Sequence, residues 1–470
     1  MAIRFGTDGW RGLIADDFTF ANVELVSRAA ARFYRKEKNA DRGIVIGYDS
    51  RFLSREFAEL SARVFASEGM RVWLTNRIST TPQVSLTARK KRLAGGIVIT
   101  ASHNPAEYNG FKLKAGYGGP SGPADIAKVQ ANVTAFEEKP PKRTPKLRSF
   151  ADYVDAGTIR EFDARSEYVE YIKKNIDLRA IKRAGFTVLY DPMFGAGIEL
   201  INLLLPKADS LHDEHNPGFI GIDHPEPLGE YLGDLSKRVR KEGYSIGLAT
   251  DGDADRLGVI AGDGSFIDSH RVFVLLLKYL FEDRKKRGMV AKTISLSTMV
   301  DDYCAKNRIK LVETPVGFKY IADLMATKNV LIGGEESGGL GTSLHIPERD
   351  GIFNGLLVME MMAKRKKTIG ELSKELDEEF GPHRYRRIDK RMTELEKNRI
   401  LKAAKKGLDS LGPYKVTGTS HLDGYKFFVD GGWLLIRASG TEPLLRFYAE
   451  ASSIAKVNRI LEAGMGIGGA

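Results

Sequence analysis

The sequence predicts an α/β protein with three related mixed-sheet α/β domains and a C-terminal α+β domain. Three observations lead to this fold class. Strand-like runs alternate with helical patterns over most of the chain, which is typical of βαβ units and mostly parallel sheets. The alternation recurs with a spacing of roughly 100–150 residues, a common domain size. The final part instead contains consecutive strands with a helical pattern on either side.

The first domain is expected over residues 1–152 and the second over residues 153–260. In the first, the strand-like run GIVIGYDSR leads to the helical pattern REFAELSARVFASEG and the strands RVWLTN and AGGIVIT. In the second, FTVLYDPMFGAG leads to IELINLLLP, and YSIGLATDGDADR follows. In each domain, strands that end in polar or glycine-rich loops are separated by helical patterns, which predicts parallel pairing.

The third domain is expected over residues 261–379 and the fourth over residues 380–470. The third contains the strand TISLST (residues 293–298), the helical pattern VDDYCAKNR, the strand in KLVETPVGF, the helix KYIADLMAT and the strand NVLIGGEESGG. The Gly-Pro break in EEFGPHRYRR marks the start of the fourth domain. Its helix RMTELEKNRILKAAKKGL precedes the strands GYKFFVD, GWLLIRAS and LRFYAEA and the helix IAKVNRILEAG.

The composition favours a cytoplasmic protein and suits a small anionic ligand. No run approaches the ~20 apolar residues of a membrane span, and the N-terminus has no apolar stretch of a signal peptide. Cys304 is the one cysteine, so no intrachain disulfide can form. The net charge is +11, but the basic residues are scattered and no aromatic residues are interleaved with them. We therefore expect a phosphorylated small molecule and neither nucleic acid nor membrane as partner.

The segment TDGDADR predicts a magnesium site. Asp251, Asp253 and Asp255 alternate directly after an apolar run, and three carboxylates so close repel each other unless a cation neutralises them. An EF-hand loop is excluded because Arg256 stands at the turn position that requires glycine, and because the loop follows a strand. Solvated surface aspartates are the remaining alternative. Ligands that are all carboxylates favour Mg²⁺ over zinc.

The segment TASHNP places a serine hydroxyl after another apolar strand. It lacks the G-x-S-x-G pattern of hydrolases, which argues against acyl transfer. The alternative is a plain turn, with Asn104-Pro105 ending the strand and Asn109-Gly110 forming a hairpin. Beside a magnesium loop, Ser102 becomes a candidate phosphoryl acceptor. His103 and Lys112 would then handle protons or charge.

Two further loops carry groups that suit a sugar phosphate. GGEESGG combines carboxylates and a hydroxyl that can bind sugar hydroxyls, and TPVGFK and LHIPERDG are expected to share that site. RASGTEP offers a guanidinium, two hydroxyls and backbone N–H groups, which suit a phosphate. A glycine-rich turn and a simple strand connection are the alternatives for these two loops. Arg11 lies in the glycine turn FGTDGWRG, where an ordinary Asp-Gly turn is the alternative.

With TASHNP, TDGDADR, GEESGG and RASGTEP in this order, the chain resembles the α-D-phosphohexomutase family of phosphoglucomutases, phosphomannomutases and phosphoglucosamine mutases over essentially its whole length. The resemblance implies four domains around a central cleft. It implies that Ser102 is a phosphoserine that binds Mg²⁺ together with the three aspartates, with a hexose 1,6-bisphosphate as intermediate and activator. Arg11, His103, Lys112 and Arg256 match positions near the reacting group. The expected substrate-binding residues are Thr314, Gly317, Lys319, Glu335, Ser337, His345, Arg349, Arg437, Ser439, Gly440, Thr441 and Arg446.

Two departures from the family pattern bear on the preferred sugar. Gly339 stands where many mannose- and glucosamine-type members have histidine, and Arg349 stands where glucose-type members have lysine. We expect reversible transfer of phosphate between the 1- and 6-positions of glucose phosphate and also of mannose phosphate, by a monomer or homodimer. A phosphoglucosamine mutase, a non-catalytic sugar-phosphate-binding paralogue and a magnesium-dependent phosphatase are the alternatives.

Overall fold

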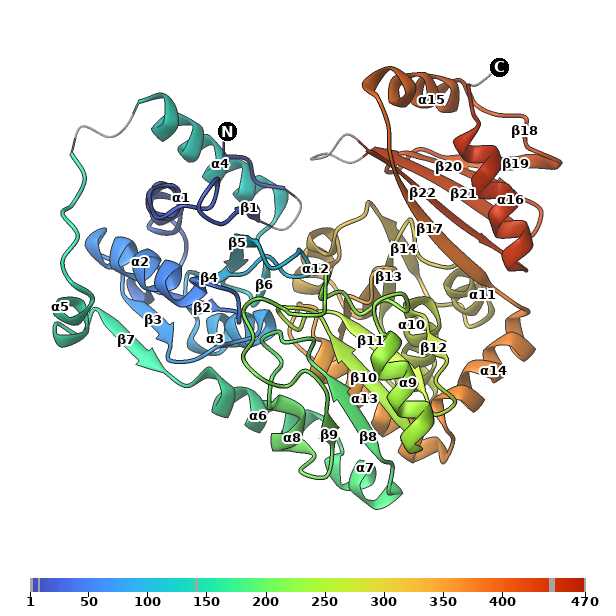
Figure 1. Ribbon diagram of the computed structural model, residues 1–470, viewed down its shortest axis with the longest axis horizontal. Coiled ribbons are helices and arrows are strands. Elements are labelled where there is room, and N and C mark those ends of the chain that lie inside the picture. The colour runs from blue at the N-terminus through green and yellow to red at the C-terminus, as the bar shows by residue number, and fades with distance from the viewer. Residues whose placement is uncertain (1–2, 7–8, 140–142, 439–443, 469–470) are drawn as a thin grey trace. The chain divides into compact units, whose positions relative to one another are not determined.

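The structure is a computed structural model that describes residues 3–6, 9–139, 143–438 and 444–468. Its contacts divide the chain into two compact units. Unit 1 comprises Met1–Gly288 and Gly317–Gly370, and unit 2 comprises Met289–Val316 and Glu371–Ala470. The predicted fold class is confirmed, because mixed α/β sheets precede a C-terminal α+β region (Figure 1).

The first sheet of unit 1 has the strand order β1-β5-β4-β2-β3-β7, with β6 beside β5. β2 pairs in parallel with β3 and β4, and β4 pairs antiparallel with β5. The loops that follow β2 and β4 therefore leave the same edge of the sheet, where ligand sites of such sheets gather. The strands are β1 (Trp10–Leu13), β2 (Ile44–Tyr48), β3 (Val72–Thr75), β4 (Gly95–Ile99), β5 (Tyr108–Ala115), β6 (Gly119–Pro120) and β7 (Ile159–Phe162).

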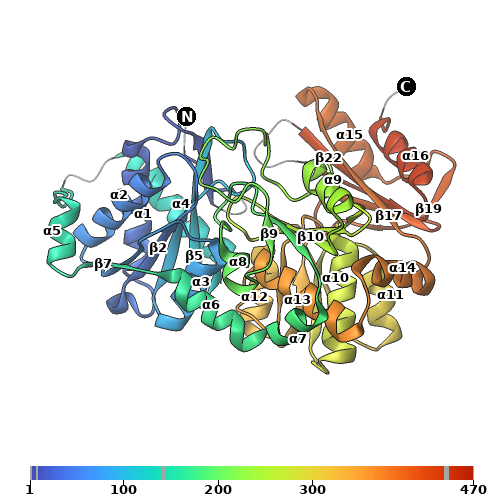
Figure 2. The same ribbon diagram turned by 60° about the horizontal axis from the view of Figure 1, so that its bottom comes forward.

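Helices cover both faces of this sheet (Figures 1 and 2). On one face, Ile44, Ile46 and Ile97 join a core with α1, α2 and α4. On the other, Val45 and Val98 pack with α3. Alternate residues of these buried strands thus face opposite layers. The elements are α1 (Phe20–Tyr34), η1 (Ala40–Arg42), α2 (Ser54–Ser67), α3 (Thr81–Lys91), α4 (Pro123–Glu138), α5 (Phe150–Asp155), α6 (Ala164–Asn175) and α7 (Leu178–Ala184).

The second sheet of unit 1 has the order β12-β11-β10-β8-β9. β10 pairs in parallel with β8 and antiparallel with β11, and all five residues of β10 are buried. The loop between β10 and β11 carries the three aspartates. The elements are β8 (Val188–Asp191), α8 (Leu200–Leu204), β9 (Asp209–Ser210), α9 (Gly233–Glu242), β10 (Ile246–Thr250), β11 (Leu257–Ala261) and β12 (Phe266–Ile267).

The rest of unit 1 is built around the antiparallel pair β15 and β16. α13 begins where Asp350 accepts a hydrogen bond from the backbone N–H of Phe353 at 2.9 Å, a side-chain N-cap. All residues of α13 from Gly351 to Met362 are buried. The elements are α10 (Ser269–Lys278), the π-helix η2 (Tyr279–Asp283), α12 (Phe318–Thr327), β15 (Val330–Gly334), β16 (Leu340–Thr342) and α13 (Gly351–Arg365).

Unit 2 contains the parallel pair β13 and β14 and an antiparallel sheet in the order β17-β22-β21-β20-β19-β18. Buried residues of β21 and β22 pack against α16 in its core. The elements are β13 (Met289–Thr293), α11 (Met299–Lys306), β14 (Leu311–Thr314), α14 (Ile369–Phe380), β17 (Arg384–Arg391), α15 (Glu394–Lys406), β18 (Ser410–Leu411), β19 (Tyr414–Ser420), β20 (Tyr425–Val429), β21 (Gly432–Ala438), β22 (Leu444–Ala451) and α16 (Ile454–Met465).

One local prediction is wrong, and one alternative is excluded. The strand expected over residues 293–298 ends at Thr293, because its register with β14 runs from Val290 opposite Leu311 to Thr293 opposite Thr314. The alternative of a hairpin turn at Asn109-Gly110 is excluded, because this pair lies inside β5. There a Cβ atom on Gly110 would approach the Thr100 carbonyl oxygen to 2.4 Å, so glycine is needed for close strand packing.

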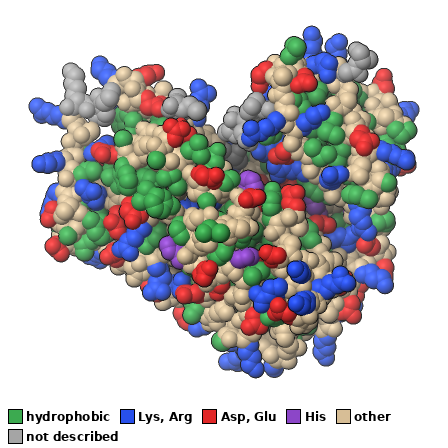
Figure 3. Space-filling model, in the orientation of Figure 1, with side chains coloured by type: hydrophobic (Ala, Val, Ile, Leu, Met, Phe, Trp, Pro, Cys, Tyr) green, Lys and Arg blue, Asp and Glu red, His purple; other side chains and the backbone are tan. Residues whose placement is uncertain are grey.

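The surface carries mixed charge. On the face drawn in Figure 3, Lys and Arg side chains are spread among acidic ones rather than gathered in one stripe. Within the described part of the chain, no helix combines the length and the apolar character that a membrane crossing requires.

Candidate active site

Ser102 lies in the loop that follows β4, with its side chain buried. Its backbone is left-handed, with φ of 55°, which is uncommon for a residue with a side chain. This conformation directs Oγ toward Asp251, and Oγ donates a hydrogen bond to Oδ2 of that residue at 2.7 Å. The Nδ1 atom of His103 lies 3.3 Å from the same Oγ. A hydroxyl, a ring that can carry a proton and a carboxylate thus meet at one point.

Asp251, Asp253 and Asp255 form a compact cluster, with one oxygen of each within 4.8 Å of the others. All three are fully buried. The loop is curled because Oδ1 of Asp251 accepts hydrogen bonds from the backbone N–H groups of Asp255 at 2.9 Å and Arg256 at 3.0 Å. Burial, and then the charges of the other two aspartates, raise the pKa of Asp251 well above its ordinary value.

These residues fit a divalent cation. The buried Oδ1 atom of Asp255 accepts no hydrogen bond from the described residues, and a buried carboxylate oxygen without a partner is costly. A cation bound by the three carboxylates would remove this cost and their mutual repulsion. Oxygen ligands of this kind suit Mg²⁺.

Gly252 allows the loop between β10 and β11 (the metal loop) to lie against the loop after β4 that carries Ser102 (the serine loop), and Gly195 allows the loop after β8 to lie against the metal loop. A Cβ atom on Gly252 would lie 2.2 Å from the backbone oxygen of Ser102. One on Gly195 would lie 2.8 Å from Cα of Gly252. The metal loop therefore approaches the serine loop and the loop after β8 backbone to backbone, and glycine at position 252 is required for the contact between Ser102 and Asp251.

Two buried cationic side chains contact the aspartate cluster. Nζ of Lys112, on β5, lies 2.7 Å from Oδ2 of Asp253 and 3.4 Å from Oδ2 of Asp255. Nη2 of Arg349 lies 2.5 Å from the same oxygen of Asp255. Such neighbours can neutralise charge on a transferring group. Asp253 also accepts a hydrogen bond from Thr81 at the start of α3.

The glycine-rich loop after β15 joins this cluster through Arg349. Nη1 of Arg349 lies 3.3 Å from Oε2 of Glu335. Burial raises the pKa of Glu335 to about 7, although the Arg349 charge partly opposes the rise. Ser337 is half-buried in the same loop. The loop is attached to the strand after the metal loop by a hydrogen bond from the Leu257 N–H to the Gly338 carbonyl.

Other predicted residues of unit 1 lie around this site or apart from it. Nη1 of Arg11, on β1, donates to the Asn104 side chain in the serine loop. Arg256 forms an ion pair with Glu226.

His345 lies apart from the aspartate cluster. It is buried beside Asp350, with 2.8 Å between its Nε2 atom and Oδ2 of Asp350, and its ring stacks on that of Phe353. Gly317 precedes α12 as its N-cap, and Lys319 lies half-buried in the first turn.

The predicted phosphate-binding residues belong to unit 2. Arg437 and Arg446 are opposite each other in the β21–β22 register. Nη2 of Arg437 lies 2.8 Å from Asp423, and Nε of Arg446 lies 3.4 Å from Asp389.

Two further sets of predicted residues complete the comparison. Thr314 ends β14, where its hydroxyl donates to the Pro315 carbonyl at 3.0 Å. Ser439, Gly440 and Thr441 lie outside the described residues.

Sequence reasoning missed several charged residues near these groups. Asp49 and Arg51 follow β2 and lie beside the serine loop, and Glu226 pairs with Arg256. Arg387 and Arg446 both contact Asp389, and Nη2 of Arg387 lies 2.6 Å from Oδ2 of Asp389. For Asp49 and Arg51 a signal was present, because the segment YDSR directly follows a buried strand, as the recognised motifs do.

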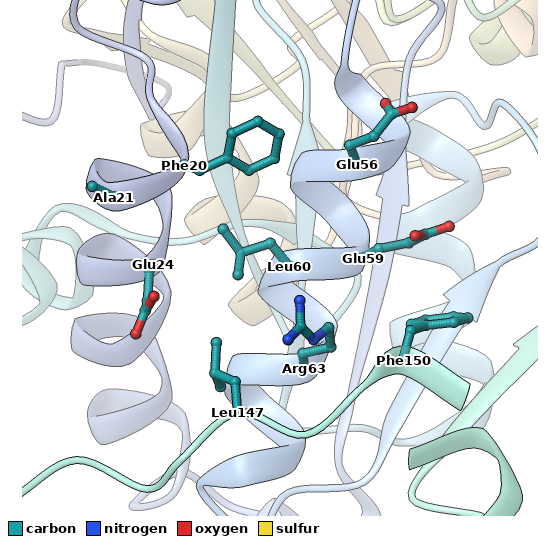
Figure 4. Close-up of a pocket in the computed structure, with 9 residues that line it drawn as sticks. All are labelled: Phe20, Ala21, Glu24, Glu56, Glu59, Leu60, Arg63, Leu147 and Phe150. Carbon is teal, nitrogen blue, oxygen red and sulfur yellow. The ribbon is translucent and has the colours of Figure 1, made fainter. Parts of the chain in front are cut away.

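A surface groove of about 500 Å³ lies elsewhere in unit 1, between α1 and α2 (Figure 4). Phe20 and Leu60 point into it from the two helices, with Leu147 below them. None of its lining residues belongs to the serine loop or to the aspartate cluster. The convergence of nucleophile, acids and cations, rather than this hollow, defines the candidate active site.

A serine beside a buried carboxylate cluster, both in loops that follow strands of α/β sheets, is typical of a phosphoryl-transfer enzyme. Comparison with known proteins supports the assignment to this class of enzyme. The chain matches the four domains of the phosphoglucomutase/phosphomannomutase family: alpha/beta/alpha domain I over residues 2–140, domain II over 166–264, domain III over 268–380 and the C-terminal domain over 388–465. The chain belongs to this family, and it is a phosphotransferase that acts as a mutase.

Three relatives illustrate the range of the family. A phosphoglucomutase/phosphomannomutase of Thermococcus kodakarensis is 32% identical, over 98% of this chain and 97% of its own. A phosphoglucosamine mutase of Carboxydothermus hydrogenoformans is 28% identical, over 97% of each chain. The crystal structure of a Thermus thermophilus protein assigned as a phosphomannomutase superposes with a TM-score of 0.84 at 33% identity, over 98% of both chains.

Proposed function

We propose that the protein transfers a phosphoryl group reversibly between the 1- and 6-positions of glucose phosphate, and also of mannose phosphate, through a phosphoserine at Ser102. The observation that carries this proposal is the 2.7 Å hydrogen bond from Ser102 Oγ to Asp251 inside the aspartate cluster. It supports a nucleophile placed where a metal-assisted phosphoryl transfer needs one.

In the forward step, the free hydroxyl oxygen of the sugar attacks phosphorus as the P–Oγ bond to Ser102 breaks. The hydroxyl proton passes to a base and Oγ of Ser102 takes up a proton as it leaves, so that the products are a serine hydroxyl and a hexose 1,6-bisphosphate. After this intermediate has turned round, its other phosphate returns to Ser102. Mg²⁺ bound to Asp251, Asp253 and Asp255 would supply positive charge to the phosphoryl group in transfer.

The surrounding side chains have distinct proposed roles. His103, 3.3 Å from Oγ, is the candidate to move a proton at Ser102. Lys112, Arg11 and Arg256 would stabilise the developing negative charge. Arg437 and Arg446 of unit 2 would hold the phosphate that does not react.

The turning of the intermediate limits which parts of the sugar can be recognised. Both orientations must fit, so contacts should bind groups that exchange places, as the 3- and 4-hydroxyls do. Glu335 and Ser337 carry the acceptor and donor for such contacts. Contacts to the 3- and 4-hydroxyls depend little on the configuration at C2, where glucose and mannose differ. Both sugar phosphates should therefore react.

Intact mass measured before and after addition of glucose 1,6-bisphosphate tests the proposal. Wild type should gain one phosphoryl mass and Ser102→Ala none. The exposed hydroxyl of Ser265 provides a matched control, and Ser265→Ala should behave as wild type. A phosphoryl group on Ser102→Ala, or undiminished mutase turnover by that variant, would overturn the proposal.

A phosphoglucosamine mutase is the second candidate, because a relative of that name matches over 97% of each chain. Competition among glucose, mannose and glucosamine 6-phosphates separates the candidates. A phosphatase would release inorganic phosphate from glucose 1-phosphate, and a non-catalytic paralogue would bind sugar phosphates without turnover.

A further inference from the structure

Arg51 sits under the serine loop and donates to four of its backbone carbonyls. Nη2 bonds the carbonyl oxygens of Ser102 at 2.7 Å and Asn104 at 2.5 Å. Nη1 bonds those of Pro105 at 2.6 Å and Tyr108 at 3.0 Å. Only 3% of Arg51 is exposed. One guanidinium thus fixes the backbone from the candidate nucleophile to the start of β5.

The guanidinium is itself held in place. Its Nε lies 3.2 Å from Oδ2 of Asp49, and Oδ1 of Asp49 accepts hydrogen bonds from the Arg51 N–H at 3.0 Å and from Ser54 Oγ at 2.7 Å. The ring of Phe219 lies 5.0 Å from the guanidinium carbon. A planar fork with fixed donor directions can meet this set of carbonyls, and a lysine ammonium cannot reproduce that geometry.

The serine loop needs such support because its conformation is unfavourable on its own. Ser102 has a left-handed backbone, and residues with side chains hold such conformations only when their surroundings enforce them. The Ser102 carbonyl lies between Arg51, which bonds it, and Gly252, which leaves room for it. Rotation of this carbonyl would move Oγ away from Asp251.

The contacts distinguish this role from general support of the fold. All four carbonyls bonded by the Arg51 guanidinium belong to residues 102–108, the loop and the first residue of β5. Loss of the guanidinium should therefore loosen this loop and leave the sheet that carries it in place.

We propose that Arg51 is a positioning residue that holds Ser102 Oγ in line with the aspartate cluster by binding the four carbonyls of its loop. This inference rests on the role proposed for Ser102. Arg51, in the segment YDSR, would thus support phosphoryl transfer without touching the substrate.

The test compares Arg51→Lys with Asp49→Asn, which keeps the guanidinium but weakens its orientation. Arg55→Lys is the matched control, since Arg55 is an exposed arginine paired with Glu59 on α2. Two properties are measured: kcat and KM for glucose 1-phosphate, and hydrogen exchange of the peptide over residues 101–110. A displacement of ~1 Å at a reacting group can cost ~100-fold in rate.

We expect Arg51→Lys to lower kcat about 100-fold with KM changed less than about threefold, and to accelerate exchange in residues 101–110 but not in β2. Asp49→Asn should show the same pattern to a smaller degree. The control should match wild type. Wild-type kcat in Arg51→Lys, or a loss confined to KM, would overturn the inference.

Two outcomes need separate interpretation. If Arg51→Lys does not fold, Asp49→Asn decides, and an unchanged kcat in that variant overturns the inference. If wild type itself shows no mutase turnover, the proposed function fails, and hydrogen exchange alone decides the structural role. Unaltered exchange of residues 101–110 in Arg51→Lys would then refute it.

Discussion

Arg349 occupies the space that a side chain at Gly339 would fill. A Cβ atom on Gly339 would lie 2.4 Å from Cδ and 3.3 Å from Cγ of Arg349. The same arginine joins Asp255 of the aspartate cluster to Glu335 of the glycine-rich loop after β15. Gly339 and Arg349 therefore form one structural feature, since glycine at 339 is what lets arginine at 349 adopt this position.

Gly339→Ala should displace Arg349 and lower kcat/KM about tenfold or more, because both ion pairs of the arginine are disturbed. In an Arg349→Ala background the clash is absent, so the second substitution should cost little. A steady-state double-mutant cycle measures this coupling, which for residues in contact is ~0.5–3 kcal/mol. Additive losses would show that the two positions act independently.

Gly252→Ala should place its methyl group against the Ser102 carbonyl, at 2.2 Å in the unrelaxed structure. The loops must then separate, and we expect kcat to fall about 100-fold while the fold is retained. Gly233→Ala is the control, because no atom lies within 4 Å of a Cβ built there. Comparable kinetics for the two variants would contradict the close approach of the loops.

Chelation of divalent cations should abolish turnover, and Mg²⁺ should restore it and raise the melting temperature. At 100 times its dissociation constant, a bound ion stabilises the folded state by ~2.7 kcal/mol. Asp255→Asn should lose most of this stabilisation, whereas the exposed Asp263→Asn should keep it. Calorimetry with and without Mg²⁺ checks the prediction, and an equal response of Asp255→Asn and wild type would contradict it.

Lys426 should make the stability of the fold depend on pH. Burial, and then the charge of Lys292, lower the pKa of Lys426 from 10.5 to about 8. Its Nζ donates to the Ile294 carbonyl at 2.6 Å and lies 4.2 Å from the centre of the Trp433 ring. Between pH 8 and 10.5 the Lys426 side chain holds more protons in the unfolded chain than in the folded protein. The contribution of Lys426 to the free energy of unfolding therefore rises with pH over this range.

Urea unfolding of wild type and Lys426→Met at several pH values isolates this effect. The difference in unfolding free energy should move in favour of wild type from about pH 8 to about pH 10. The exposed Lys415→Met corrects for the loss of one positive charge. A difference that stays constant with pH would contradict the prediction.

The local sequence was sufficient to predict the α/β class and the loops that carry reactive groups. Alternation of apolar strands and helical patterns is a local signal, and polar motifs directly after a strand mark the edge where ligands bind. The extent of β13 was predicted wrongly because its partner β14 sets its length. The Asn-Gly pair at residues 109–110 left a hairpin turn open as an alternative, because only the tertiary structure shows the close neighbouring strand that explains its glycine.

By itself, the sequence determined which chemical groups the protein has and which loops present them. Only the tertiary structure decided what each group faces: Ser102 bonds Asp251 across 149 residues, Arg51 bonds the serine loop across 51, and Arg349 bonds Asp255 across 94. Such contacts depend on strand order and on where glycines let backbones approach. Side-chain chemistry is fixed by residue type, whereas proximity between distant residues arises only when sheets and loops pack together.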